Sequence, residues 1–162
     1  MFRNLLVLVD GSRHAEQALT DAIELAEQSN GRLTLLTSVT RVPAPLAFAN
    51  TDAVTAQTLS NDALSYAQQI LCDARDRVPA DVPVTTLLSR EPIRKAVLGE
   101  LKRGAHDLVV MGSRGHGAVA SALVGSVSHF MLQHSPVPVL IVHLDKAHEL
   151  VQPGSPSETA RA

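Results

Sequence analysis

Five short apolar runs recur along the chain and are separated by stretches with helical spacing. The runs cover residues 5–9, 33–39, 82–88, 107–111 and 137–142, and several are rich in valine. Continuous or nearly continuous runs of this length are typical of parallel strands that are covered on both faces. The pattern therefore predicts five buried parallel strands.

Between these runs, apolar residues recur three and four positions apart, as they do on the buried face of a helix. The four stretches lie within residues 15–26, 56–74, 93–101 and 127–131. Local signals agree, because Asn30-Gly31 is typical of a helix end and Ser89 with Pro92 is typical of a helix start. Such strand–helix alternation predicts an open parallel α/β sheet with helices on both faces.

Two segments fall outside this alternation. Residues 40–55 form a long polar and small-residue connection, and connections of this length in a compact domain are usually functional or mobile. Residues 146–162 lack periodicity, which predicts a flexible tail. We therefore expect one domain over residues 1–145, followed by this tail.

The composition narrows the function classes. The 162 residues correspond to about one domain, and with only 2% aromatic residues the core must be aliphatic. The net charge is −2 without a Lys/Arg cluster, which argues against nucleic-acid binding. No apolar run approaches the roughly 20 residues that span a bilayer. The single cysteine, Cys72, excludes an intramolecular disulfide, so we expect a cytosolic protein and interpret Cys72 as a small apolar residue on a helix.

The most informative motif is a glycine-rich loop after the fourth run. Gly112, Gly115 and Gly125 lie between that run and the serines Ser126 and Ser128, where a helix is predicted to start. Unpaired N–H groups and the positive end of a helix dipole make such a place suitable for a phosphate. We expect the glycines to allow positive φ angles and close ligand approach, and a serine to be the helix N-cap.

Three strand ends are predicted to meet if the first and fourth strands are neighbours. Because ligands in such sheets bind at the carboxyl ends of strands, the site would be formed by Asp10-Gly11-Ser12, the region of Val39, and Met111-Gly112. Asp10 is either a ligand contact or the cap of the first helix, a role that Ser12 fits equally well. Arg114 either pairs with a phosphate or is a solvated loop residue.

Other nucleotide and catalytic motifs do not fit. No lysine follows the glycines, as a P-loop requires, and the first strand does not lead into the dinucleotide fingerprint. His129 and His134 are five positions apart, which is poor helix geometry for a shared metal ion. His116 is interpreted as an exposed loop residue rather than a γ-phosphate contact. No placed general base is evident, so any ATP hydrolysis should be slow. Ser126 and Ser128 lack a His–Asp partner set, which argues against serine-nucleophile chemistry.

The sequence resembles the ATP-binding branch of the universal stress protein family over residues 2–143. That branch carries the pattern G-x2-G-x9-G-(S/T), which matches Gly112, Gly115, Gly125 and Ser126 without a gap. The apolar run before Asp10 and the run at 137–142 are similar to the family's first and last strands. Many members have a proline where this chain has Leu8, a difference outside the expected site.

The resemblance implies a Rossmann-like sheet of strand order 3-2-1-4-5, a homodimer, and bound adenine nucleotide, namely ATP with Mg²⁺ or Mn²⁺. It places Asp10 beside the ribose or a nucleotide-bound metal ion, and Val39 beside the adenine. The residues expected around the phosphates and along the same crevice are Gly11, Ser12, Met111, Gly112, Arg114, Gly115, Gly125, Ser126, Val127 and Ser128. In this order the last strand is an edge, so residues 137–143 would pair two copies of the chain.

We therefore predict a cytosolic ATP-binding stress-response or regulatory protein that acts as a nucleotide-dependent homodimer with an unidentified regulatory partner. Two alternatives stay open. An enzyme similar to the adenine-nucleotide α-hydrolases would need motifs for a second substrate, and 162 residues leave little room for them. A nucleotide-free interaction module of the same fold usually loses the glycine pattern, which this chain retains.

Overall fold

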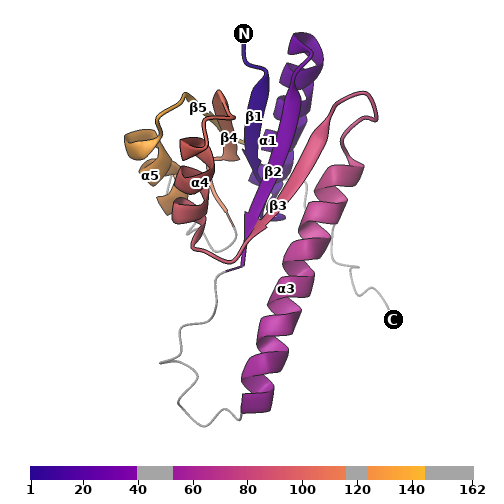
Figure 1. Cartoon of the computed structure of the whole chain (residues 1–162), viewed down its shortest axis with the longest axis vertical. Coiled ribbons are helices and arrows are strands. Elements are labelled where there is room, and N and C mark those ends of the chain that lie inside the picture. Colours follow the sequence, from indigo (N-terminus) through magenta and orange to yellow (C-terminus); the bar gives the residue numbers. More distant parts are fainter. Residues whose placement is uncertain (40–52, 116–123, 145–162) are drawn as a thin grey trace, which may run out of the picture.

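The computed structural model describes residues 1–39, 53–115 and 124–144. One sheet of five strands forms its centre (Figure 1), and the strands are β1 (Asn4–Leu8), β2 (Arg32–Ser38), β3 (Val84–Ser89), β4 (Leu108–Gly112) and β5 (Val139–Val142). Their order is β3-β2-β1-β4-β5, and all four pairings are parallel. This confirms the predicted fold class and strand order.

Helices cover both faces of the sheet, two on each within the described residues. One face packs against α1 (Arg13–Ser29) and α3 (Ala53–Asp76), and the other against α4 (Ile93–Lys102) and α5 (Ser126–His134). Alternate residues of β1 enter the two cores, since Leu5 packs with Leu19 of α1 and Leu6 packs with Val97 of α4. Both faces of β1 are therefore buried, which explains why its sequence is continuously apolar.

The amino edge of the sheet is fixed by one carboxylate. Asp107 accepts hydrogen bonds from the backbone N–H groups of Arg3 at 2.9 Å and Asn4 at 3.0 Å. Its own N–H donates to the Asn4 carbonyl at 2.9 Å. These contacts hold the N-terminal residues at the edge opposite the carboxyl ends of the strands (Figure 1).

A buried histidine lies near this edge. His106 is 9% exposed, and its Nε2 is 3.0 Å from the hydroxyl of Thr34. Its Nδ1 has no hydrogen-bond partner within the described parts of the chain. Burial lowers the pKa of His106, and the carboxylates of Glu100 and Asp107 oppose this effect.

Several predicted boundaries differ from the structure for local reasons. β3 begins at Val84 and β5 at Val139, two residues later than predicted; the residue before β5, Pro138, has no N–H to donate. Pro92 is the N-cap of α4 and forms no side-chain capping hydrogen bond, and the helix begins at Ile93 as predicted. The predicted end of α1 is confirmed, because Asn30 is its C-cap with a φ of 51°.

Two further properties concern the helices. Cys72 lies on α3 as predicted, but it is exposed, so it is not a packing residue. None of the described helices is long and apolar enough to cross a membrane.

Candidate functional site

The turn after β1 carries the carboxylate of Asp10. Ser12 is the N-cap of α1, and its Oγ accepts a hydrogen bond from the Ala15 N–H at 3.3 Å. The same hydroxyl donates to Asp10 Oδ1 at 2.6 Å, and the Ser12 N–H donates to that oxygen at 2.9 Å. Gly11 makes this turn with a φ of 78°, a conformation that favours glycine. Ser12 therefore caps the helix, and it holds Asp10 at the end of the strand.

The loop after β4 passes directly beside this carboxylate. A Cβ built on Gly115 would lie 2.5 Å from Asp10 Oδ2, closer than two such atoms can approach. β1 and β4 are neighbours in the sheet, as the predicted meeting of their ends requires. The glycine loop and the acidic strand end thus share one place on the carboxyl edge.

The end of β4 also packs tightly on the first turn of α1. A Cβ on Gly112 would lie 2.7 Å from the backbone carbon of His14. The next residue, Ser113, is fully buried, and its Oγ is 3.2 Å from His14 Nδ1. The sequence pattern gives no sign of this pair, because its two residues are far apart in the chain and meet only through the strand order.

The N-terminus of α5 lies at the same loop. The Gly125 N–H donates to the Ser113 carbonyl at 2.6 Å, and the buried Ser128 hydroxyl donates to the Gly112 carbonyl at 3.0 Å. Gly125 is the N-cap and Ser126 is the first helical residue, so the prediction of a serine N-cap is wrong. The N–H groups of residues 126–128 have no acceptor within the helix, and together with the helix dipole they favour an anion.

The glycines of this loop are required by close approach rather than by backbone conformation. Among the described residues, the glycines with positive φ are Gly11 and Gly104, whereas Gly125 has a φ of −69°. The expectation of positive φ at the loop glycines is therefore wrong for Gly112, Gly115 and Gly125. At Gly125 a Cβ would lie 3.3 Å from the Ser113 carbonyl oxygen, which is a tight contact with backbone.

A cation from α4 lies beside the start of α5. Arg94 donates through Nη2 to the Ser126 carbonyl at 3.0 Å, and its guanidinium carbon is 5.1 Å from the centre of the Phe130 ring. This contact adds positive charge next to the helix N-terminus. A single arginine on an amphipathic helix has no distinctive spacing, so the sequence did not indicate Arg94.

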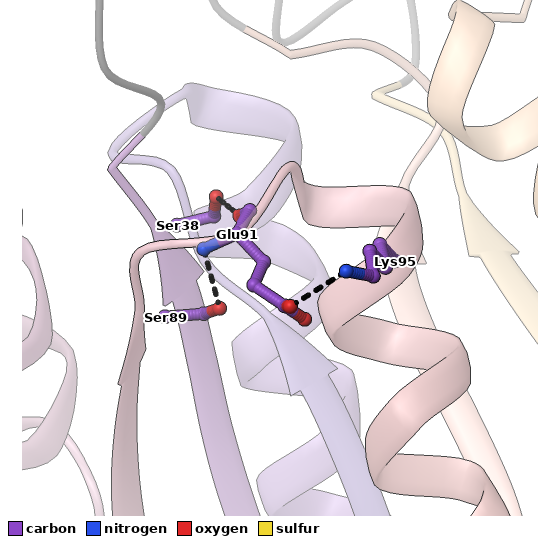
Figure 2. Close-up of polar contacts among 4 residues, drawn as sticks. All are labelled: Ser38, Ser89, Glu91 and Lys95. Atoms are coloured by element: carbon purple, nitrogen blue, oxygen red, sulfur yellow. Dashed lines mark hydrogen bonds and ion pairs between the residues drawn. The ribbon is translucent and has the colours of Figure 1, made fainter.

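The end of β2 is the third predicted part of the site. The N–H of Val39 donates to the Ser89 carbonyl of β3 at 2.9 Å, so this group is already used. Val39 can therefore contact a ligand through its half-buried apolar side chain. The backbone N–H and C=O of Ser38, the residue before it, point in the opposite direction, toward β1. Figure 2 shows the side chain of Ser38 beside the turn between β3 and α4, where its Oγ donates to the Glu91 carbonyl at 2.6 Å.

The remaining predicted residues differ in what they present. Met111 is 4% exposed and packs into the core between the sheet and α4, so only its backbone lies at the edge. Val127 is half-buried against the same core, and Arg114 is half-buried beside Ser113. His116, the connection at 40–52 and residues 145–162 lie outside the described residues.

A cation would find one carboxylate here. Over the residues that the structure describes, no group of three or more His, Cys, Asp or Glu side chains could hold a metal ion. Asp10 alone fits a cation that takes its other ligands from phosphate oxygens and water, as Mg²⁺ usually does.

A separate cavity of about 190 Å³ lies between α1 and α3, and its walls include Val9, Gly11, Leu19, Tyr66 and Arg77. The cavity touches the turn at Gly11 but lies on the face of the sheet that α1 and α3 cover. Helix α5 covers the opposite face. This cavity is therefore not the place that the loop and the N-terminus of α5 form.

Comparisons with known proteins agree along most of the chain. The family model described as the Universal stress protein family matches residues 1–143. A universal stress protein of Thermus aquaticus is 32% identical over 145 residues, which cover 88% of this chain and 99% of that protein. The universal stress protein YxiE of Bacillus subtilis is 30% identical over 148 residues, which cover 88% of this chain and 99% of that protein.

Solved structures share the fold. A universal stress protein in complex with cAMP is 24% identical with a TM-score of 0.65, covering 89% of this chain and 99% of that chain. A family member from Arabidopsis thaliana with AMP bound is 17% identical with a TM-score of 0.62, covering 90% of this chain and 94% of that chain. At these identities the likeness concerns the arrangement of strands and helices.

Proposed function

This chain belongs to the universal stress protein family, and from that premise we propose that it binds an adenine nucleotide at the carboxyl edge of its sheet. The proposed ligand is ATP with Mg²⁺ or Mn²⁺. Binding would regulate a homodimer in a stress response, in the reducing cytosol expected for a chain with a single cysteine, and hydrolysis would be slow at most.

One observation carries this proposal. The Asp10 carboxylate, the glycine loop and the N-terminus of α5 converge at the ends of two neighbouring strands. An anion can sit against the N–H groups of residues 126–128, while a cation between that anion and Asp10 balances the charge. A turn that only joined β4 to α5 would not need a carboxylate beside it.

The ligands of two structural neighbours support the adenine class. One neighbour was solved with cAMP and another with AMP, and both ligands contain adenosine and at least one phosphate. ATP shares these parts, so a site for adenosine and one phosphate at the strand ends is compatible with all three.

Residue roles follow from the places described above. Asp10 would contact the metal ion or the ribose, and the backbone of Gly112, Gly115 and residues 125–128 would surround the phosphates. Arg114 and Arg94 would add positive charge to this region. Gly11, Ser12, Met111 and Val39 would line the crevice toward the adenosine.

The homodimer would form through β5. This strand pairs with β4 on one side, and in the strand order it is the edge of the sheet. Its residues 139–141 are half-buried and apolar, and an apolar edge favours pairing with another chain. Two copies related by a two-fold axis would join their β5 strands antiparallel over residues 137–143.

Isothermal titration calorimetry tests the proposal. Purified protein is titrated with ATP, ADP, AMP and cAMP, each with and without Mg²⁺, and the Asp10→Asn variant is the matched control. We expect binding of at least one adenine nucleotide, and a smaller Mg²⁺ effect in the variant. The absence of binding heat and of a thermal shift with all four would reject nucleotide binding and favour an interaction module.

A further inference from the structure

We propose that Ser38 is a positioning residue for the nucleobase. Its hydroxyl holds the backbone edge that selects adenine over guanine. This inference rests on the proposed function, because it concerns the base of the same nucleotide. It assigns a role to a side chain that neither the glycine motif nor the resemblance includes.

The hydrogen bonds of β2 alternate between its two neighbours. The Arg32 N–H donates to the Arg3 carbonyl, and the Leu36 carbonyl accepts from Val9, so these residues face β1. The Leu33 N–H donates to Pro83 and the Val39 N–H donates to Ser89, so these residues face β3. In a parallel strand the N–H and C=O of one residue point to the same side. Even-numbered residues of β2 therefore face β1, and Ser38 is the last of them.

At Ser38, however, β1 has already ended. Within the described residues, the bond from the Val9 N–H to the Leu36 carbonyl at 3.0 Å is the last one between these two strands. After Val9 the first strand does not continue: Asp10 follows, and the chain turns at Gly11 into α1. The N–H and C=O of Ser38 consequently face the space at the end of β1, next to the proposed ligand site.

The N–H and C=O of Ser38 form a donor beside an acceptor, which complements the edge of adenine but not that of guanine. Adenine presents an acceptor at N1 next to a donor at its amino group, whereas guanine presents a donor at N1 next to an acceptor at O6. With the phosphates held at the glycine loop, the base cannot turn over to exchange these groups. With guanine, donor would face donor and acceptor would face acceptor. Binding would then desolvate the polar groups of Ser38 and of the base without giving them hydrogen-bond partners, which weakens the affinity.

The side chain of Ser38 fixes this edge. Figure 2 shows three connected groups, which we call the β2-end clamp: Ser38, Ser89 and the backbone of Glu91. The Ser38 Oγ donates to the Glu91 carbonyl at 2.6 Å, and the Glu91 N–H donates to the Ser89 Oγ at 3.1 Å. With the bond from Val39 to Ser89, the clamp ties the end of β2 to the turn before α4.

Lys95, also drawn in Figure 2, is a matched control position. Lys95 forms an ion pair with Glu91 at 2.8 Å, and the two side chains are 73% and 52% exposed. The clamp uses only the backbone of Glu91, so removal of Lys95 leaves all clamp bonds in place. An exposed pair of this kind contributes little to stability.

The test measures dissociation constants for ATP and GTP, both with Mg²⁺, by calorimetry for four proteins. The wild type should prefer ATP by at least about 100-fold, because mispaired polar groups discriminate strongly. Ser38→Ala should weaken ATP binding by about fivefold to tenfold, the effect of one lost hydrogen bond, with GTP binding nearly unchanged. Ser38→Thr keeps the hydroxyl and should restore the ATP-to-GTP preference, and Lys95→Ala should leave it as in the wild type.

The outcomes separate the two proposals. If the wild type binds ATP and Ser38→Ala keeps the same preference, or loses ATP and GTP binding equally, the role of Ser38 is wrong and the proposed function stands. If the wild type binds no adenine nucleotide, the proposed function itself is wrong. Circular dichroism checks folding, and Ser89→Ala is a second clamp variant in case Ser38→Ala does not fold. Ser89→Ala should also reduce the preference for ATP over GTP, and an unchanged preference in this variant would overturn the inference.

Discussion

The carboxylate of Asp10 lies beside the backbone of Gly115, so closely that no side chain fits between them, although the two residues are far apart in the sequence. A single methyl group at position 115 would lie 2.5 Å from Asp10 Oδ2. Ser12 holds Oδ1 of the same carboxylate through two hydrogen bonds. The Asp10 carboxylate therefore cannot move away from an added methyl group without losing its hydrogen bonds to Ser12.

Gly115→Ala should weaken binding of ATP with Mg²⁺ by about tenfold, or about 1.4 kcal/mol. The methyl group must displace either the carboxylate or the loop, and both belong to the proposed site. Calorimetry measures the change, with Gly99→Ala as the control because a Cβ there meets nothing within 4 Å. Equal affinities in both variants would contradict a ligand site between Asp10 and the loop.

Gly125→Val should reduce ATP affinity by tenfold or more, about 1.4 kcal/mol, while the protein stays folded. The φ of −69° at Gly125 suits any residue, so the effect comes from the branched side chain beside the helix N-terminus. The same titration, with circular dichroism as the folding check, tests this. Unchanged affinity would mean that the phosphates do not lie at the start of α5.

Gly112→Ala should lower the free energy of unfolding by about 1–3 kcal/mol through overpacking. A Cβ there meets the backbone and Cβ of His14 at 2.7 Å, and neither atom belongs to a flexible side-chain end. Urea denaturation measures the change. Gly99→Ala, in the interior of α4, should instead raise stability by about 0.5–1 kcal/mol because alanine favours the helix.

Ile141→Glu or Val139→Lys should shift the protein from dimer toward monomer or aggregate. A charge on β5 would be buried without a partner when two such edges pair. Light scattering at micromolar concentration measures the mass. Thr85→Glu, on the opposite edge strand β3, is the matched control and should remain dimeric. A monomeric wild type would reject the β5 dimer.

The stability of the fold should fall as the pH drops below about 6.5, the ordinary pKa of histidine, and His106 should account for part of the loss. Burial lowers the pKa of His106 in the folded state, so the unfolded chain binds more protons in this range. Stability is then fully present above the unfolded pKa and is lost as the pH falls toward the folded one. Thermal denaturation of the wild type and His106→Gln at pH 7.5 and 5.5 measures the difference. An equal pH effect in both would contradict the assignment.

Local patterns predicted most of the fold. β1 and β4 had continuous apolar runs because both of their faces are covered, whereas the edge strand β3 carries the exposed Thr85 and Thr86. Asn30 ended α1 because it tolerates a left-handed φ. Strand order came from the resemblance, since local patterns contain no information on neighbours. The choice between Asp10 and Ser12 as the helix cap stayed open because both residue types cap helices equally well.

The parts of the site that were not predicted depend on contacts between distant segments. His14 meets Ser113, and Ser38 meets Glu91, only after the sheet has formed. Gly112 and Gly125 were recognised, but for the wrong physical reason, because a sequence cannot tell a glycine needed for close approach from one needed for positive φ. The φ angle in the folded chain and the space around the Cα separate the two cases.

The contacts of Asp107 with Arg3 and Asn4 have a practical consequence for the experiments above. They anchor the start of the chain at the amino edge, and β1 alone separates that edge from Asp10 by about 17 Å for its five residues. A surface-attachment tag or a fluorophore placed before Met1 would thus project away from the nucleotide side. Immobilised protein should present its binding edge to the solution, whereas removal of the first four residues would free Asp107 and loosen the sheet from the other end.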